Sequence, residues 1–258
     1  MTSLRQELPP HGQLGLFDIE LDLVSAAHVP STMVADATPP RRVRSDGSNA
    51  GLLKGLTLVA PYYIPRIGAC QLVPEKLIAF SESMSQKTPD PEAWVHFYED
   101  DYRFQRLWAS PEAYMPRLRG FAGIITPDFS VFRNMPSAEK IHQIYRNQLL
   151  GARMQADGLN VIANVRLSGR DSIPYAIAGT PSNSTVALGL HGCPRSGANR
   201  RHVLEEISIM CTELTPSNIV VYGSAAYQVL EYPRERGIAV HIFRPDAFER
   251  SRSRRQTA

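Results

Sequence analysis

Residues 185–222 have the sequence TVALGLHGCPRSGANRRHVLEEISIMCTELTPSNIVVY. The stretch begins and ends with two runs, Thr185–Leu190 and Ile219–Tyr222, that are apolar on both faces, as strands in a covered parallel sheet are. Between them, Arg201–Leu214 places apolar residues three and four positions apart before Pro216, the pattern of a helix that packs on one face. A strand, a helix and a second strand in this order predict a βαβ unit.

The same alternation of apolar runs and helical patterns extends outward from this unit. Five further runs are candidate strands: Leu56–Pro61, Trp94–Tyr98, Ala122–Thr126, Val161–Val165 and Ile238–Phe243. Three further helices begin at start signals: Glu75–Met84 after Pro74, Glu112–Leu118 after Ser110 and Pro111, and Ala138–Asp157 between a capping Ser137 and Gly158. Seven strands interleaved with about four helices predict an α/β domain with a largely parallel sheet, either open and doubly wound or a barrel. We favour an irregular (β/α) barrel.

The two ends of the chain lack this periodicity. Residues 1–50 show no sustained period of 2 or 3.6, and residues 39–49 (PPRRVRSDGSN) are polar, charged or turn-forming, a composition that buries too little apolar surface to offset the entropy of ordering. Residues 249–258 (ERSRSRRQTA) carry four arginines and are typical of a solvated end. We therefore predict a disordered arm over 1–50, a single α/β domain over 51–248 and a basic tail over 249–258.

Composition excludes several classes of protein. The net charge of +3 over 258 residues is not that of a basic domain, so affinity for nucleic acid would come from a local patch or from the tail. Three cysteines without metal-ligand spacing argue against a disulfide framework or a zinc ribbon. No apolar run approaches the roughly 20 residues of a membrane span, and we expect a cytoplasmic protein. Neither GxxxxGK[ST] nor GxGxxG occurs, so ATP-driven and dinucleotide-dependent chemistry are unsupported.

A short motif stands out within the predicted arm. Residues 13–17 are Gln-Leu-Gly-Leu-Phe, and Gln13, Leu14, Leu16 and Phe17 match all four specified positions of the bacterial sliding-clamp-binding motif that the segment resembles, Gln-Leu-x-Leu-Phe. A disordered peptide can dock such an apolar pair in a pocket while the glutamine amide binds its rim. The resemblance implies that the DNA polymerase sliding clamp is a partner. Alternatively, the leucines and the phenylalanine cover the domain or form one more strand.

Polar residues gather just after the predicted strands, where ligands of α/β proteins usually bind. The candidate site residues are Asp100, Asp101, Asp128, Ser130, Arg133, Asn164, Arg166, His191 and Tyr222. Carboxylates on neighbouring strand ends can converge, so Asp100, Asp101 and Asp128 are candidate ligands of a divalent cation or catalytic acids and bases. Arg133 and Arg166 would contact phosphate. Alternatively, the acids cap helices and pair with Arg103 and Arg133.

His191 precedes Gly192 and Cys193, an order that admits a base and a nucleophile. A lone histidine near a turn is more often structural, so this interpretation stays secondary to the acidic residues.

Several longer segments resemble the domain-of-unknown-function family 4417, which occurs widely in phages, prophages and mobile elements. They are FYEDD at 97–101 with Trp108, GIITPDFSVFRNMP at 123–136, YRN at 145–147, VIANVR at 161–166, NSTVAL at 183–188, Gly192 with Cys193, and VYG at 221–223. The resemblance covers about residues 55–245 and implies a mobile-element protein, but no activity.

Three functions remain open at this point. The leading hypothesis is a phage or plasmid protein that acts on DNA or on the replication machinery and is recruited to the host sliding clamp through residues 13–17. The second is a non-enzymatic protein that occupies or inhibits the clamp. The third is an enzyme on a nucleotide or small metabolite, in which case the clamp-like motif is accidental.

Overall fold

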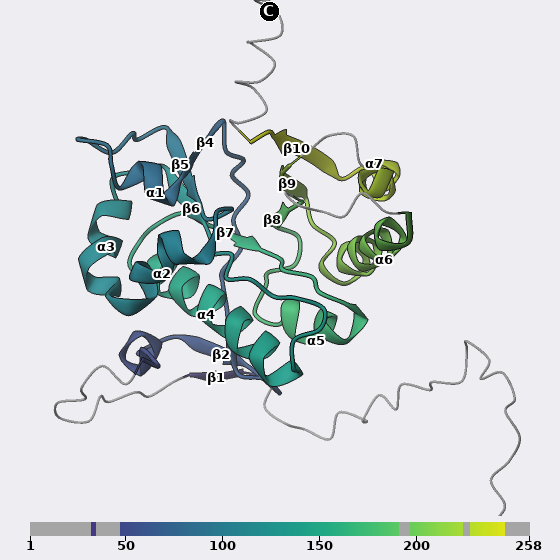
Figure 1. Ribbon diagram of the computed structural model, residues 1–258, viewed down its shortest axis with the longest axis horizontal. Coiled ribbons are helices and arrows are strands. Elements are labelled where there is room, and N and C mark those ends of the chain that lie inside the picture. The colour runs from purple at the N-terminus through teal and green to yellow at the C-terminus, as the bar shows by residue number, and fades with distance from the viewer. Residues whose placement is uncertain (1–31, 35–46, 191–196, 224–227, 246–258) are drawn as a thin grey trace, which may run out of the picture. The chain divides into compact units, whose positions relative to one another are not determined.

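The computed structural model describes residues 32–34, 47–190, 197–223 and 228–245, and its main element is a parallel sheet of seven strands (Figure 1). The strands are β4 (Lys76–Ala79), β5 (Ala93–His96), β6 (Gly123–Ile125), β7 (Val161–Asn164), β8 (Thr185–Gly189), β9 (Asn218–Tyr222) and β10 (Ala239–Phe243). They lie in the order β10-β9-β8-β7-β6-β5-β4. Since spatial order follows chain order, every right-handed crossover returns over the same face of the sheet.

The sheet curls into a half-barrel. Three strands separate β5 from β9, which in a flat sheet would hold the two about 19 Å apart at roughly 4.8 Å per step. The rings of His96 on β5 and Tyr222 on β9 nevertheless have their centroids 4.4 Å apart. Side chains alone do not close such a gap, so the strand ends bend toward each other. The predicted α/β fold with an irregular barrel is confirmed as a curled, seven-stranded half-barrel.

In the described part of the chain, seven helices accompany the sheet. They are α1 (Phe80–Ser83), α2 (Asp101–Ala109), α3 (Pro111–Leu118), α4 (Ser137–Ala156), α5 (Ile173–Ala176), α6 (Gly197–Leu214) and α7 (Glu231–Glu235), with short 3-10 turns at Ala50–Leu53, Arg170–Ser172 and Gln228–Leu230. Figure 1 shows α1 to α4 beside β4 to β7, and α6 with α7 beside β8 to β10. In the described part of the chain no helix has the length and apolar character needed to cross a membrane.

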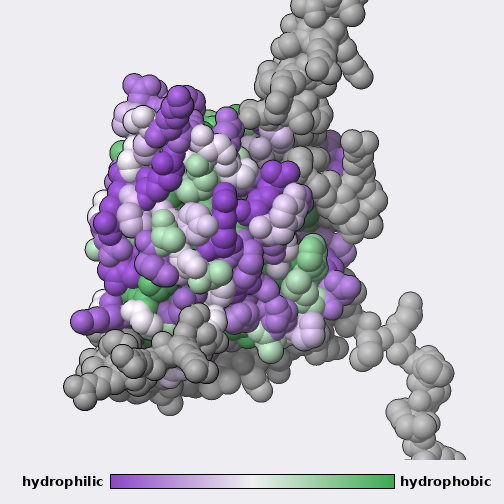
Figure 2. Space-filling view, turned by 60° about the vertical axis from the view of Figure 1, so that its left-hand side comes forward, coloured by the Kyte–Doolittle hydropathy of each residue, from purple (hydrophilic) through white to green (hydrophobic). Residues whose placement is uncertain are grey.

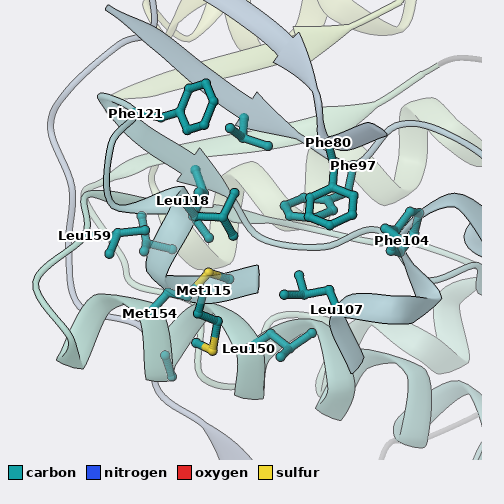
Figure 3. Close-up of a cluster of buried hydrophobic side chains, with 14 of the residues drawn as sticks. Phe80, Phe97, Phe104, Leu107, Met115, Leu118, Phe121, Leu150, Met154 and Leu159 are labelled. Atoms are coloured by element: carbon teal, nitrogen blue, oxygen red, sulfur yellow. The ribbon is translucent and has the colours of Figure 1, made fainter. Parts of the chain in front are cut away.

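Alternate side chains of each strand enter different cores, because successive residues point to opposite faces. On β5 and just after it, Val95 and Phe97 join the large core beneath the helices, where Figure 3 shows Phe97 directed toward Leu107 and Leu150. Trp94 and Tyr98 lie in a smaller cluster on the concave face. Helices thus cover the convex face, and the concave face holds its own narrow core.

The concave face is filled at the amino ends of the strands and left open at their carboxyl ends. Cys70 is buried there beside Trp94 and Ala187. Its backbone N–H donates to Ser184 Oγ at 2.9 Å, and its carbonyl accepts the Thr185 N–H at 2.8 Å. This segment covers the amino-terminal end of the half-barrel.

A second, antiparallel sheet has three strands in the order β1-β2-β3 and shares no strand with the parallel sheet. It comprises β1 (Thr32–Val34), β2 (Thr57–Val59) and β3 (Ile64–Pro65). The run predicted at Leu56–Pro61 therefore forms a strand, but not in the parallel sheet. β1 falls inside the predicted arm, whose residues 1–31 and 35–46 lie outside the described residues, as does the predicted tail.

Two predicted helix starts are wrong. Glu75–Met84 is not one helix, because residues 76–79 pair with β5 as β4 and only the single turn α1 follows; pairing with a buried neighbour outweighs local helix propensity. Ser137 is the first helical residue of α4 rather than its cap, a position that Pro136 occupies. Helix α2 was not predicted.

Candidate functional site

A cavity of about 450 Å³ opens at the carboxyl ends of the parallel strands. All seven strands contribute to its lining, either with their last residue or with one to three residues further on: Ala79, His96, Asp128, Arg166, Gly189, Tyr222 and Pro245. The remaining lining residues are Ser81, Glu82, Tyr98, Glu99, Asp100, Arg103 and Ser130. Barrel enzymes carry their active sites at this end of the sheet, so the cavity is the candidate site, and we call it the carboxyl-edge pocket.

Asp128 is the buried acid of the pocket. Its Oδ1 accepts a hydrogen bond from Asn164 Nδ2 at 2.7 Å, and its Oδ2 pairs with Arg166 at 3.0 Å. Burial raises the pKa of Asp128, while Arg166 and Asn164 act in the opposite direction. A carboxyl group that keeps its proton to higher pH than usual is suited to donate or accept a proton during a reaction.

Helix α4 fixes the loop that carries Asp128. The next residue, Phe129, donates its backbone N–H to Asn147 Oδ1 at 2.9 Å and accepts a longer bond from Asn147 Nδ2 at 3.4 Å. The guanidinium of Arg146 lies 3.5 Å from the centroid of the Phe129 ring. Asn147 and Phe129 are both buried, so the direction of the Asp128 side chain depends on this anchor.

Three rings form one wall of the pocket: His96, Tyr98 and Tyr222. Tyr98 stacks on Tyr222 with centroids 5.0 Å apart and planes inclined by 14°, and its hydroxyl donates to Asn164 Oδ1 at 3.1 Å. Burial lowers the pKa of His96 to about 3, so its imidazole is neutral near pH 7. Its Nδ1 accepts the Tyr98 N–H at 3.2 Å, which places the proton on Nε2.

The acids at the mouth of the pocket are held by hydroxyl and amide groups. Asp101, the first residue of α2, accepts bonds from the Ser130 hydroxyl at 2.8 Å and from the Ser130 N–H at 3.1 Å. Glu99 likewise accepts the Ser81 N–H at 2.9 Å and the Ser81 hydroxyl. Asp100 is exposed at the start of α2. Of the predicted residues, Asp100, Asp128, Ser130, Arg166 and Tyr222 line the pocket, with Asp101 and Asn164 bonded to them.

Arg133 is placed elsewhere. It pairs at 2.9 Å with Glu206 on α6, a buried acid that also accepts the Gly169 N–H, and it does not line the pocket. The alternative pairing of Asp128 with Arg133 is not observed, because Arg166 occupies that position. His191 and the residues Gln13, Leu14, Leu16 and Phe17 lie outside the described residues.

The described residues do not fit the divalent cation that the sequence suggested. Within them, no group of three or more His, Cys, Asp or Glu side chains gathers as metal ligands do. Both oxygens of Asp128 already accept bonds from Asn164 and Arg166, and a guanidinium beside the carboxylate opposes a second cation.

Sequence reasoning predicted Tyr222 but missed the other two rings of the aromatic wall. His96 and Tyr98 lie inside the predicted strand 94–98 and were not among the candidate site residues. The available signal was the spacing of two residues, which puts both rings on one face of a strand whose other face is apolar.

Comparison with known proteins gives a family match and phage relatives. The model described as "Domain of unknown function (DUF4417)" matches residues 56–250. The "Gene 1 protein" of Mycobacterium phage D29 is 29% identical over 180 residues, which are 67% of each chain. The "Gene 1 protein" of Mycobacterium phage L5 is also 29% identical over 180 residues, covering 67% of this chain and 79% of its own.

Proposed function

Since the chain belongs to the DUF4417 family of domains of unknown function and has phage Gene 1 proteins among its relatives, we propose that it acts on DNA at the host replication machinery, holding one nucleotide unit in the carboxyl-edge pocket. The observation that carries the proposal is the convergence of all seven strand ends on a cavity with an aromatic wall and a buried acid.

The chemistry of the lining suits a nucleotide. Tyr222, backed by the stacked ring of Tyr98, offers an aromatic surface to the plane of a base. Asp128 supplies the lining with a carboxyl group, which can recognise a base edge by hydrogen bonding, and Asn164 holds that carboxyl group in place. Arg103, exposed at the mouth, and Arg166, beside Asp128, supply positive charge for phosphate. A cavity of about 450 Å³ lies within the usual range for small ligands, roughly 300–1,000 Å³.

Asp128 is the residue to which we assign proton transfer. Its raised pKa follows from burial, and the Asn147 anchor fixes its direction. Arg166 would keep the charged form available, because its guanidinium lies 3.0 Å from Oδ2. An acid whose two protonation states are both accessible can act as a general acid or a general base.

Recruitment through residues 13–17 completes the proposal. Its support is the match of the sequence to the clamp-binding motif, Gln-Leu-x-Leu-Phe. Binding to the clamp would raise the local concentration of the domain at DNA, so a domain of net charge near zero could act there without strong affinity of its own. If the protein instead only occupies the clamp, residues lining the pocket are dispensable for its effect.

A second candidate, an enzyme on a free nucleotide or small metabolite, is favoured by the limited volume of the pocket. The two enzymatic hypotheses differ in the size of the ligand. If the substrate is a free nucleotide, it should bind as tightly as the same nucleotide within a strand. If the protein acts on DNA, the strand should bind more tightly, because flanking nucleotides add contacts.

The proposal can be tested by calorimetric titration of the four deoxynucleoside monophosphates. We expect at least one to bind the wild type, and Asp128→Asn to weaken that binding at least about tenfold, or roughly 1.4 kcal/mol. Asp90→Asn is the matched control, because Asp90 pairs with Lys76 at the amino ends of the strands. Absence of binding by all four, or equal binding by wild type and Asp128→Asn, would reject the proposal.

A further inference from the structure

Two exposed aromatic side chains lie beside the mouth of the pocket. Tyr102 follows Asp101 at the start of α2, and Phe132 follows Ser130 by two positions. Because Asp101 and Ser130 are joined by hydrogen bonds of 2.8 and 3.1 Å, these two segments run next to each other. We call Tyr102, Arg103 and Phe132 the aromatic rim.

The rings of Tyr102 and Phe132 are exposed, although apolar residues next to them on the same segments are buried. Tyr102 is 71% exposed and Phe132 is 54% exposed, whereas Phe104 and Val131 on the same segments are buried at 0% and 4%. The core is therefore supplied by other residues, and the rim rings keep apolar area in water. Aromatic rings whose faces stay in water remain available to stack on the bases of a ligand.

Arg103 adds a positive charge to the aromatic rim. Its guanidinium lies 5.5 Å from the centroid of the Tyr102 ring, and the same side chain lines the pocket. Among the described residues no carboxylate lies within salt-bridge distance of it. An arginine that has no acidic partner among the described residues and lies beside an exposed ring offers both a phosphate contact and a stacking surface.

We infer that the aromatic rim binds a single-stranded nucleic acid, whose flanking bases stack on Tyr102 and Phe132 while one nucleotide enters the pocket. Single strands expose base faces, which duplexes hide, and aromatic side chains with arginine are the usual means of binding them. A protein partner fits less well, because the side of α1 to α3 in Figure 2 is mainly hydrophilic, with small and separated apolar areas, whereas the centre of a protein interface is apolar.

The inference rests on the proposed function, and one experiment separates the two. Fluorescence anisotropy with a labelled twelve-nucleotide thymidine strand measures binding at the rim, and calorimetric titration with mononucleotides measures binding in the pocket. For Tyr102→Ala with Phe132→Ala we expect at least a tenfold loss of affinity for the strand, with mononucleotide affinity unchanged within twofold. Both side chains are exposed, so we expect the melting temperature of this variant to stay that of the wild type.

The matched control is Tyr63→Ala with Leu72→Ala, which removes two exposed apolar side chains, 43% and 50% accessible, away from the pocket lining; its affinity for the strand should equal that of the wild type. A uridine strand of the same length shows whether the rim prefers DNA or RNA, since its chemistry suits both. Equal affinity of wild type and rim variant for both strands, or duplex binding as tight as single-strand binding, overturns the inference. Strand binding that needs the rim, without mononucleotide binding, would keep the assignment of the rim to a single strand and reject the proposed function of the pocket.

Discussion

Replacing Gly189 with alanine tests the geometry of the pocket most severely, because the added methyl group would meet the buried ring of Tyr98. A Cβ atom at Gly189 would lie 2.8 Å from both Cδ1 and Cε1 of Tyr98 and 3.6 Å from Asp128 Oδ2. Carbon atoms in proteins approach to about 3.5–4.0 Å, so the Tyr98 ring would have to shift by about 0.7 Å or more. The ring stacks on Tyr222 and is bonded to Asn164.

The expected cost follows from two opposing effects. Overpacking of this kind costs about 1–3 kcal/mol, and displacement of the Tyr98 hydroxyl from Asn164 adds about 1 kcal/mol. Alanine in a strand gains roughly 0.5–1 kcal/mol over glycine, which is the smaller effect. We therefore expect the free energy of unfolding to fall by about 1–3 kcal/mol and nucleotide binding to weaken.

Urea denaturation of Gly189→Ala and of Gly51→Ala, followed by Trp and Tyr fluorescence, measures this difference. A Cβ at Gly51 would meet nothing within 4 Å, so this control should be as stable as the wild type or slightly more stable. A Gly189→Ala variant as stable as Gly51→Ala, with unchanged ligand binding, would refute the described contact between β8 and Tyr98.

Three further predictions concern the anchor, the buried acid and the arm. Asn147→Ala removes both bonds to the Phe129 backbone and leaves a buried N–H without a partner, so urea denaturation should show a loss of about 1–3 kcal/mol; an unchanged midpoint would contradict the anchor. The folded-state pKa of Asp128 is raised, so its contribution to stability is full below the ordinary value of 3.8 and is lost as pH rises through the folded pKa. The stability of Asp128→Asn relative to the wild type should therefore increase with pH above about 4, and a difference that does not vary with pH would show that the carboxyl group titrates normally. A peptide of residues 11–20 should bind a bacterial sliding clamp in a calorimetric titration, and Leu16→Ala with Phe17→Ala should weaken it at least about tenfold; equal binding of both peptides would exclude recruitment through this motif.

Local sequence patterns were sufficient to predict most strands of the sheet and part of the site. The runs at β8 and β9 are apolar at successive positions, and Arg201–Leu214 is amphipathic, so the unit β8–α6–β9 follows from sequence alone. Asp128 and Arg166 follow strands directly, and parallel strands bring such positions to one edge. β4 could not be found in the same way, because its conformation depends on pairing with β5, and its exposed first residue, Lys76, gives no strand signal.

The aromatic wall and the ion pair of Asp128 could not be predicted from the sequence, because both depend on how the sheet and its loops are arranged in space. His96 and Tyr222 are 126 positions apart in the chain and meet only because β5 and β9 bend toward each other. Whether Asp128 pairs with Arg133 or Arg166 depends on which side of the loop each arginine occupies, and composition does not determine that. The partners that surround Asp128 are also distant in sequence, since Asn164 and Arg166 follow it by 36 and 38 positions.

The central claim is that the carboxyl-edge pocket holds one nucleotide unit, and a crystal structure of the protein grown with a bound mononucleotide tests it most directly. We predict density for the base against Tyr222, polar contacts from the base edge to Asp128, and the phosphate near Arg103 or Arg166. A nucleotide bound elsewhere on the domain, with the pocket filled by water alone at saturating ligand, would contradict the account.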